Sequence, residues 1–272
     1  MRPRWNRWRS ADPLVRVGRI ALVVYLAFIG LPLVALVARA VGAEGFLSSI
    51  TGPIALQALR LSAVTGVISL AVIVAVGTPF AYILARSRSR LMRFVDTLVE
   101  LPIVLPPVVV GVALLMAFGR RGLLGPGLEL LGVTIPFTAT AVVMAQTAVA
   151  GPFYIRAAKL GFQAVQTDLE DVSQTLGASP WRTFWCVTVP LAWPALMGGA
   201  ALALARALSE FGATIMFAGS FQGRTQTMPL AILSAMESSL STALALSALL
   251  LSVSLGILLV LALATRLQGE RR

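Results

Sequence analysis

The chain has 272 residues, of which 58% are hydrophobic and only 12% are charged, which excludes an ordinary soluble domain. The net charge of +11 does not indicate nucleic-acid binding, because no solvated basic domain carries it; the basic residues instead mark membrane topology. With no histidine and one cysteine, Cys186, the chain has neither a His- or Cys-based metal site nor an intramolecular disulfide bond.

The first 60 residues predict a basic tail, a membrane span and an external loop. Residues 1–19 hold six arginines and two tryptophans, which is typical of the cytoplasmic side of a membrane. Ile20–Ala38 is uncharged and close to the ~20 residues that a spanning helix needs. A signal peptide is the alternative, since Ala38-Arg39-Ala40 resembles a cleavage site, but the apolar run is longer than the usual ~7–15 residues. A retained span is therefore expected within residues 20–60.

Residues 61–266 form the predicted membrane core, and residues 267–272 form a cytoplasmic C-terminus. Inner segments carry 16 of the 22 basic residues and outer segments carry five, in agreement with six spans and two cytoplasmic termini. The expected fold class is therefore an all-α membrane protein with about six transmembrane helices. Besides a short helix at Thr225–Met236 that need not cross fully, the expected spans of the core are Leu61–Ala85, Leu101–Gly119, Ile135–Ile155, Pro194–Ala218 and Leu240–Thr265.

The third span begins with the sequence LPIVLPPVVVG. Pro102, Pro106 and Pro107 each lack a backbone N–H, so this helix must bend or open near its start. Ordinary bending and a pore-lining helix with a widened end both fit this pattern. Arg120 and Arg121 follow in a glycine-rich outer loop, either to draw an anion toward a pore or as solvated loop charges.

The fifth span carries charge within an apolar run. Arg206 and Glu210 are four residues apart, which places them on one helix face near the middle of the span. Each charge at the membrane centre costs about 2.5–3.5 kcal/mol, so the two are expected to pair or to face water. Two interpretations fit this pair: a salt bridge that locks helix packing, or a position beside a translocation pathway. Gly199, Ala203 and Ala207 form a small-residue stripe for close helix packing.

A polar segment, Thr167–Pro194, lies between the fourth and fifth spans and predicts two short helices joined by a tight corner. Thr167 and Glu170 fit a capping box, and Gly177 suits the position after the first helix. Ser179 and Pro180 predict the start of a second helix, from Trp181 to Val189, that ends at Pro190. The first helix carries one apolar stripe, formed by Leu169, Val172 and Leu176.

This segment resembles the EAA loop of ABC-importer permeases: Glu-Ala-Ala, three residues, Gly, nine residues, Ile-x-Leu-Pro. Asp171-Val172-Ser173 stands at the first three positions, with Asp in place of Glu and Val-Ser in place of Ala-Ala; Gly177 and Val187–Pro190 match. In that family the loop is a cytoplasmic coupling helix that docks in a cleft of the ATPase subunit; the alternative is an interfacial helix pair without a partner. The implied coupling residues, in a loop at about 163–190, are Leu169, Glu170, Asp171, Val172, Ser173, Leu176, Gly177, Ala178 and Pro190.

Three blocks, LPIVLPPVVVG, GRRGLLG and ARALSEFGATIMFAGSFQGRTQTMPLAI, resemble the permease subunits of molybdate ABC importers, over about Leu61 to Arg266. Sulfate permeases share the first block and part of the third, while Phe211 and the GATIMF run favour molybdate, with tungstate as a further candidate. The resemblance implies a homodimer, a pair of ATPase subunits and an extracytoplasmic oxyanion-binding protein. The implied translocation pathway includes Pro102, Pro106, Pro107, Arg206, Glu210, Gly212 and Thr214.

No GxxxxGK[ST] sequence occurs, so the chain has no P-loop to hold ATP phosphates. We therefore expect no catalytic residue, no metal and no cofactor in this chain, with ATP and Mg²⁺ bound by the partner ATPase. The expected location is the plasma (inner) membrane, in contact with lipid and not with nucleic acid. A sulfate or thiosulfate permease is one alternative. An ATP-independent secondary anion transporter is another, although it should show an internal repeat with paired broken helices, which is not found.

Overall fold

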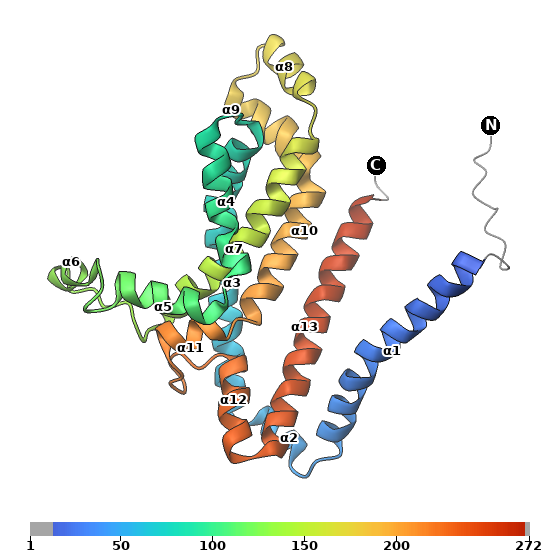
Figure 1. Ribbon diagram of the computed structural model, residues 1–272, viewed down its shortest axis with the longest axis vertical. Helices are drawn as coiled ribbons and strands as arrows, with labels where there is room; N and C mark the ends of the chain where they lie inside the picture. Colours follow the sequence, from blue (N-terminus) through green and yellow to red (C-terminus); the bar gives the residue numbers. More distant parts are fainter. Residues whose placement is uncertain (1–12, 270–272) are drawn as a thin grey trace.

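The computed structural model describes residues 13–269, and within that range every regular element is helical (Figure 1). The expected all-α class is thus confirmed. The predicted tail residues before Pro13 and the final residues 270–272 lie outside the described residues. The long helices are α1 (Pro13–Val41), α3 (Pro53–Arg86), α7 (Ala139–Ala164), α10 (Val189–Leu208) and α13 (Leu240–Gly269).

Shorter helices connect and flank the long ones. They are α2 (Phe46–Thr51), α4 (Arg90–Val104), α5 (Pro107–Phe118), α6 (Gly125–Leu130), α8 (Thr167–Thr175), α9 (Pro180–Thr183), α11 (Gly212–Ala218) and α12 (Met228–Ser238), together with the π-helical turn η1 (Phe184–Thr188). In Figure 1, α8 and α9 lie at one end of the molecule and α2 and α12 at the other, while α5 and α6 project sideways. Helix α1 begins and α13 ends on the α8 side.

Four stretches of the described chain are long and apolar enough to cross a membrane, and the bent pair α4 and α5 makes a fifth if it counts as one span. These stretches are Val15–Val41, Pro53–Arg86, Pro180–Leu208 and Leu240–Ile257. Helix α7 is long enough to cross but does not belong to this group. It packs against both α3 and α10, so its sequence is rich in small residues rather than in large lipid-facing ones. A multi-pass membrane protein is confirmed, whereas the count of six spans stays a prediction.

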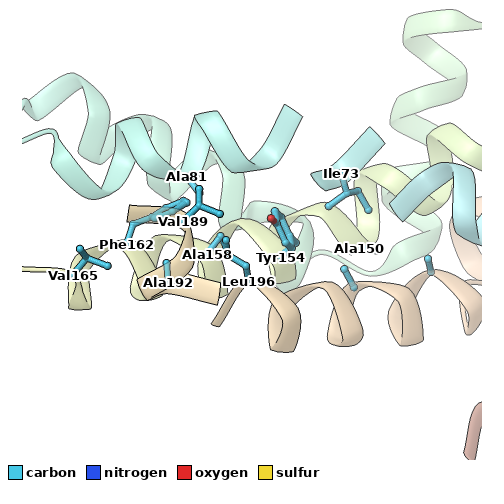
Figure 2. Packing of buried hydrophobic residues seen from close by; sticks show 12 residues of the cluster. Ile73, Ala81, Ala150, Tyr154, Ala158, Phe162, Val165, Val189, Ala192 and Leu196 are labelled. Atoms are coloured by element: carbon cyan, nitrogen blue, oxygen red, sulfur yellow. The ribbon is translucent and has the colours of Figure 1, made fainter. Parts of the chain in front are cut away.

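The core of the molecule is the contact of α7 with α3 and α10. Figure 2 shows Tyr154, Ala158 and Phe162 of α7 between residues of the two neighbouring helices. Close approach depends on small residues: a Cβ built on Gly199 would lie 2.8 Å from the Cβ of Ala157 in α7. Ala203 and Ala207 are fully buried. The small-residue stripe predicted on the fifth span is therefore confirmed as a helix-packing face.

The third span, predicted over Leu101–Gly119 with a bend or opening near its start, is indeed interrupted there, but its bounds differ from the prediction. The chain forms α4 and α5 instead, and the two helices meet at an angle of 116°. Leu105 and Pro106 are extended, because each precedes a proline and is therefore kept out of the helical conformation. Pro107 then begins α5, where its missing N–H costs nothing.

Two other helix ends differ from the sequence-based expectation. The fifth span does not run from Pro194 to Ala218; α10 ends at Leu208 and α11 begins at Gly212. Pro190 does not end a helix, because the chain continues from η1 into α10 through it. In the π-helical turn, the Val189 N–H donates to the Phe184 carbonyl five residues back, and this wider turn relieves the clash between a proline ring and the preceding turn.

Residues 39–60, expected to form an external loop and the entry to the next helix, are mostly helical. Helix α1 continues to Val41, α2 follows, and α3 already begins at Pro53 rather than at Leu61. Similarly, α7 runs beyond Ile155 to Ala164. An apolar run in the sequence gives the length of helix that faces lipid. A helix extends beyond that length where its polar ends reach water, so the apolar runs underestimate the lengths of these helices.

Candidate functional site

The predicted coupling segment is anchored by Glu170, the one buried residue of α8. The capping box predicted for Thr167 and Glu170 was wrong: Gln166 precedes the helix, and no side chain caps it. The Glu170 carboxylate instead accepts hydrogen bonds from Arg86 of α3 (2.7 Å) and from the Thr188 hydroxyl of η1 (2.6 Å). Charged pairs of this kind are stronger than neutral hydrogen bonds. Glu170 thus ties α8 to two core helices.

The corner after α8 confirms the prediction made for Gly177. This glycine has φ +89°, a left-handed conformation that other residues adopt only at a cost. Its N–H donates to the Gln174 carbonyl (2.9 Å), and the Ala178 N–H donates to the Ser173 carbonyl (3.1 Å). This pair of bonds is a Schellman motif. It satisfies carbonyls at the helix end and fixes the direction in which the chain leaves α8.

The start of the second short helix also agrees with the prediction. The Ser179 hydroxyl accepts from the Arg182 N–H (3.3 Å), and Pro180 is the first helical residue. The hydroxyls of Ser173 and Thr183 lie 3.1 Å apart and join α8 to α9. The two short helices therefore form one structured unit at the end of the molecule (Figure 1).

The predicted apolar stripe of α8 faces away from the rest of the chain. Leu169 is 44% exposed, Val172 57% and Leu176 84%. Trp181 of α9 is also largely exposed. The polar Asp171 and the corner Gly177 are exposed on the same short unit. A cluster of exposed large apolar side chains beside polar residues is typical of a protein-binding surface.

Arg206 and Glu210 form an ion pair of 2.8 Å, but they do not share a helix face as predicted. Glu210 lies in the break between α10 and α11, where its other oxygen accepts the Ala213 N–H (2.7 Å). The Glu210 carboxylate is fully buried, whereas Arg206 is partly exposed. A carboxylate that caps the first turn of α11 stabilises a new helix start, which explains why the chain breaks at this place.

The structure brings several predicted pathway residues together where α11 packs on α5. A Cβ on Gly212 would lie 3.1 Å from the Cβ of Pro107, and one on Gly111 would lie 2.7 Å from the Ala213 carbonyl oxygen. Thr214 is fully buried in α11, and its hydroxyl has no hydrogen-bond partner among the described residues. Pro106 lies at the break between α4 and α5, and Pro102 lies in the last turn of α4. Two half-helices with small contact residues therefore meet beside a buried ion pair.

Two pockets of the described chain contain basic side chains. One, of ≈ 360 Å³, lies between α3, α4 and α7 and includes Arg88, Arg93 and Lys159, with Lys159 paired to Asp96 at 2.5 Å. The other, of ≈ 390 Å³, includes Arg120 and Arg224. Among residues 13–269 no group of three Asp, Glu or Cys side chains is placed to hold a metal ion. Neither pocket could be predicted from the sequence, because each joins residues that are far apart in the chain.

Comparison with known proteins gives the family. Residues 77–269 match the family of binding-protein-dependent transport system inner membrane components. Over 229 residues the chain is 46% identical to the molybdenum transport system permease protein ModB of Mycobacterium tuberculosis, covering 84% of this chain and 86% of that protein. It is 34% identical to the sulfate transport system permease protein CysW of Synechococcus elongatus over 266 residues, 97% of this chain and 93% of the relative.

The fold agrees with this match. The fold resembles that of one chain in a crystal structure of a bacterial alginate ABC transporter, solved in complex with an alginate pentasaccharide-bound periplasmic protein. The two chains superpose with a TM-score of 0.74 at 16% sequence identity. The match covers 91% of this chain and 92% of that one. With a family match over most of its length and a relative at 46% identity, the protein belongs to the binding-protein-dependent transport system inner membrane components, the membrane permeases of ABC importers.

Proposed function

We propose that this chain is the membrane subunit of an ATP-driven importer for molybdate, with tungstate as a second cargo. The 46% identity to a mycobacterial permease named for molybdenum transport supports the cargo and is the single observation that carries it. ATP would be bound by a separate ATPase, since the chain has no P-loop sequence. A second copy of this chain and an extracytoplasmic binding protein would complete the importer.

The unit of α8 and α9 is the proposed docking surface for the ATPase. It presents an apolar stripe of Leu169, Val172 and Leu176 that the described residues 13–269 leave largely exposed. Its corner is held by hydrogen bonds, so a partner meets a preformed surface and little ordering entropy is lost on binding. In this arrangement α8 lies in the cytoplasm, and both termini lie on the same side.

Movement at the docking surface would reach the membrane through Glu170. Because the carboxylate holds both Arg86 at the end of α3 and Thr188 just before α10, displacement of α8 displaces two core helices. A docked rigid element that favours one of two packing states is an established means of switching a transporter. Asp171, Gly177 and Ala178 would contact the ATPase, whereas Glu170 acts inside this chain as a positioning residue.

The proposed route for the anion runs beside α5 and α11. Irregular backbone at membrane depth is tolerated only where protein buries it or where it borders water, and the chain breaks twice in this region, at Leu105–Pro106 and at Ser209–Phe211. Gly111 and Gly212 allow the two half-helices to lie in close contact. The Arg206–Glu210 pair neutralises itself, which suits a route that must release its anion.

A sulfate permease is the second candidate function. It is favoured by one observation, namely that the sulfate permease relative aligns with 97% of this chain at 34% identity. Related oxyanions share charge and tetrahedral shape, so the fold alone does not separate them.

Uptake of labelled molybdate, in cells with and without this chain, tests the proposal. We expect uptake to be lost on deletion, to be blocked by excess tungstate and to be indifferent to excess sulfate. Equal competition by sulfate would identify a broader or sulfate-type permease. Unchanged uptake of molybdate after deletion would contradict the molybdate proposal.

A further inference from the structure

We propose that the pocket between α5, the segment before α7 and the loop after α11 is a low-affinity binding site for a tetrahedral oxyanion. This inference rests on the proposed function and adds to it a place where the anion is received. The pocket, of ≈ 390 Å³, is lined by Leu115, Arg120, Thr134, Pro136, Phe137, Thr138 and Arg224.

The lining is basic and contains no acidic residue. Arg120 and Arg224 are separated by more than one hundred positions in the sequence, yet they border the same cavity. Neither forms a salt bridge in the part of the chain that the structure describes. Arginine presents a planar fork of N–H donors that matches tetrahedral oxyanions. Two unpaired arginines thus complement the charge of a divalent anion.

The other basic pocket serves as a contrast. There Arg88 and Arg93 also form no salt bridge within residues 13–269. However, Asp96 lies on the same wall, paired with Lys159, so a bound anion would face a carboxylate. In the pocket of Arg120 and Arg224, the other polar groups are Thr134 and the N-terminus of α7, whose cap Thr138 is one of the lining residues. The helix dipole adds to the positive potential at that wall.

Both arginines lie on chain segments whose shape is fixed. Around Arg120, the N–H groups of Leu123 and Leu124 donate back to α5 carbonyls, and a Cβ on Gly125 would lie 2.4 Å from the Arg120 carbonyl oxygen. Near Arg224, the Thr225 hydroxyl accepts from the Phe221 N–H (3.1 Å), and the Arg224 N–H donates to the Phe221 carbonyl (3.0 Å). The backbone from which each exposed arginine side chain extends is therefore held in place.

The part of the pocket wall that Phe137 forms is also constrained. Phe137 has φ +62°, the one non-glycine residue with positive φ in the described chain. Its N–H donates to the Phe217 carbonyl of α11 (3.3 Å), and its ring packs edge-on against Phe221. A conformation of this kind persists only where its surroundings hold it, and such residues gather at binding sites. The segment before α7 and the loop after α11 thus form one surface.

The location fits the entry side of the proposed route. Figure 1 shows α11 and α12 on the side of α5 away from α8, which is the extracytoplasmic side if α8 docks the ATPase. Arginines are disfavoured on that side of membrane proteins, so a pocket that contains two of them calls for a specific role. The site is open and has no closed cage of donors, so it would release its anion quickly, as a transport route requires.

The test uses the full transporter and measures how fast a thiol placed in the pocket is modified, which does not depend on transport. Thr134 is exposed on the wall and is changed to cysteine in a Cys186→Ser background, which leaves one thiol in each copy of this chain. The initial rates of modification by an anionic and by a cationic methanethiosulfonate are then compared. We expect the anionic reagent to be favoured, and Arg120→Gln with Arg224→Gln to lower the anionic-to-cationic rate ratio by roughly tenfold or more, as electrostatic steering predicts. Arg121→Gln, which lies outside the pocket, is the matched control and should leave the ratio nearly unchanged.

Competition identifies the ligand. Molybdate, tungstate or sulfate should slow the anionic reagent in the transporter with both arginines and not in the double Gln variant, while chloride at equal ionic strength should not. Absence of slowing, or slowing that persists without the arginines, overturns the site.

The same assay in nanodiscs separates a free oxyanion from other occupants. If anionic phosphatidylglycerol alone protects the thiol and phosphatidylcholine does not, the pocket holds a lipid headgroup and the proposal is wrong. If only the binding protein protects it, the arginines belong to a docking surface, which also overturns the site. Failure of molybdate uptake by the unmodified transporter would refute the proposed cargo. Protection of the thiol by an oxyanion is measured separately, so the two proposals can fail independently.

Discussion

Glu170 of α8 accepts a hydrogen bond from Arg86, 84 positions earlier at the end of α3, over 2.7 Å. The same carboxylate oxygen accepts from the Thr188 hydroxyl, so one residue of a short surface helix holds two elements of the core. We therefore expect Glu170→Ala to lower the free energy of unfolding by about 1–3 kcal/mol, because Arg86 is left partly buried without its partner. The thermal midpoint of the purified transporter measures this loss.

Asp168→Asn is the matched control for that variant. Asp168 is an exposed acid in the first turn of the same helix, and its replacement should change stability by less than about 0.5 kcal/mol. Equal midpoints for Glu170→Ala and Asp168→Asn would show that the buried ion pair does not anchor α8.

Gly177→Asp should abolish transport and co-purification of the ATPase while the chain still inserts. A Cβ at this position meets nothing within 4 Å, so the effect arises from the left-handed backbone and from the added charge at the docking surface. Gly177→Asn should be tolerated better, because asparagine adopts this conformation more readily. Membrane insertion, uptake and pull-down of the ATPase are measured together. Normal transport in Gly177→Asp would refute the docking assignment.

Leu176→Ala should weaken ATPase binding without unfolding the chain. Leu176 is 84% exposed, so its loss should change the free energy of unfolding by less than about 0.5 kcal/mol. If it is buried in the ATPase cleft, truncation should cost more than about 1 kcal/mol of binding, or roughly a fivefold rise in the dissociation constant. Leu130→Ala in α6, a leucine that is 90% exposed, is the control. Identical dissociation constants for the two variants would place the docking surface elsewhere.

Gly199→Val should lower the free energy of unfolding by about 1–3 kcal/mol, because the new Cβ would overlap Ala157 of α7. Gly198→Val is an internal control at the next position, where a Cβ meets nothing within 4 Å. The comparison removes helix propensity as a cause, since both changes replace a glycine of α10. The thermal midpoints of the two variants are measured by fluorescence-detected gel filtration. Equal decreases in midpoint for Gly199→Val and Gly198→Val would contradict the close packing of α7 and α10.

Arg206→Ala should be more damaging than Arg206→Ala combined with Glu210→Ala. The single change leaves the fully buried Glu210 carboxylate without its cation, at a cost of about 3–5 kcal/mol, whereas the double change removes that unpaired charge. The double variant still loses the carboxylate that caps α11. Expression level and thermal midpoint report the difference. A double variant as unstable as the sum of the two single ones would show that the two residues do not interact.

The sequence predicts correctly those features that depend on neighbouring residues in the chain. Gly177 and Ser179 were placed correctly, because a left-handed corner and a helix cap are specified by a few adjacent residues. The bend at Pro106 and Pro107 follows from the missing donors of proline. Glu170 was misinterpreted as part of a capping box, because the sequence gives no sign that Arg86 lies beside it.

By itself, the sequence determined an all-α, multi-pass membrane protein with a structured polar segment between two apolar ones, since hydrophobicity and local turn chemistry act over short stretches. Only the tertiary structure decided that α10 ends before Glu210, that Pro190 lies inside a continuous helix, and that Arg120 and Arg224 share one pocket. These features depend on contacts between segments far apart in the chain, and such contacts override local preference where packing and buried charge contribute more free energy than helix propensity does.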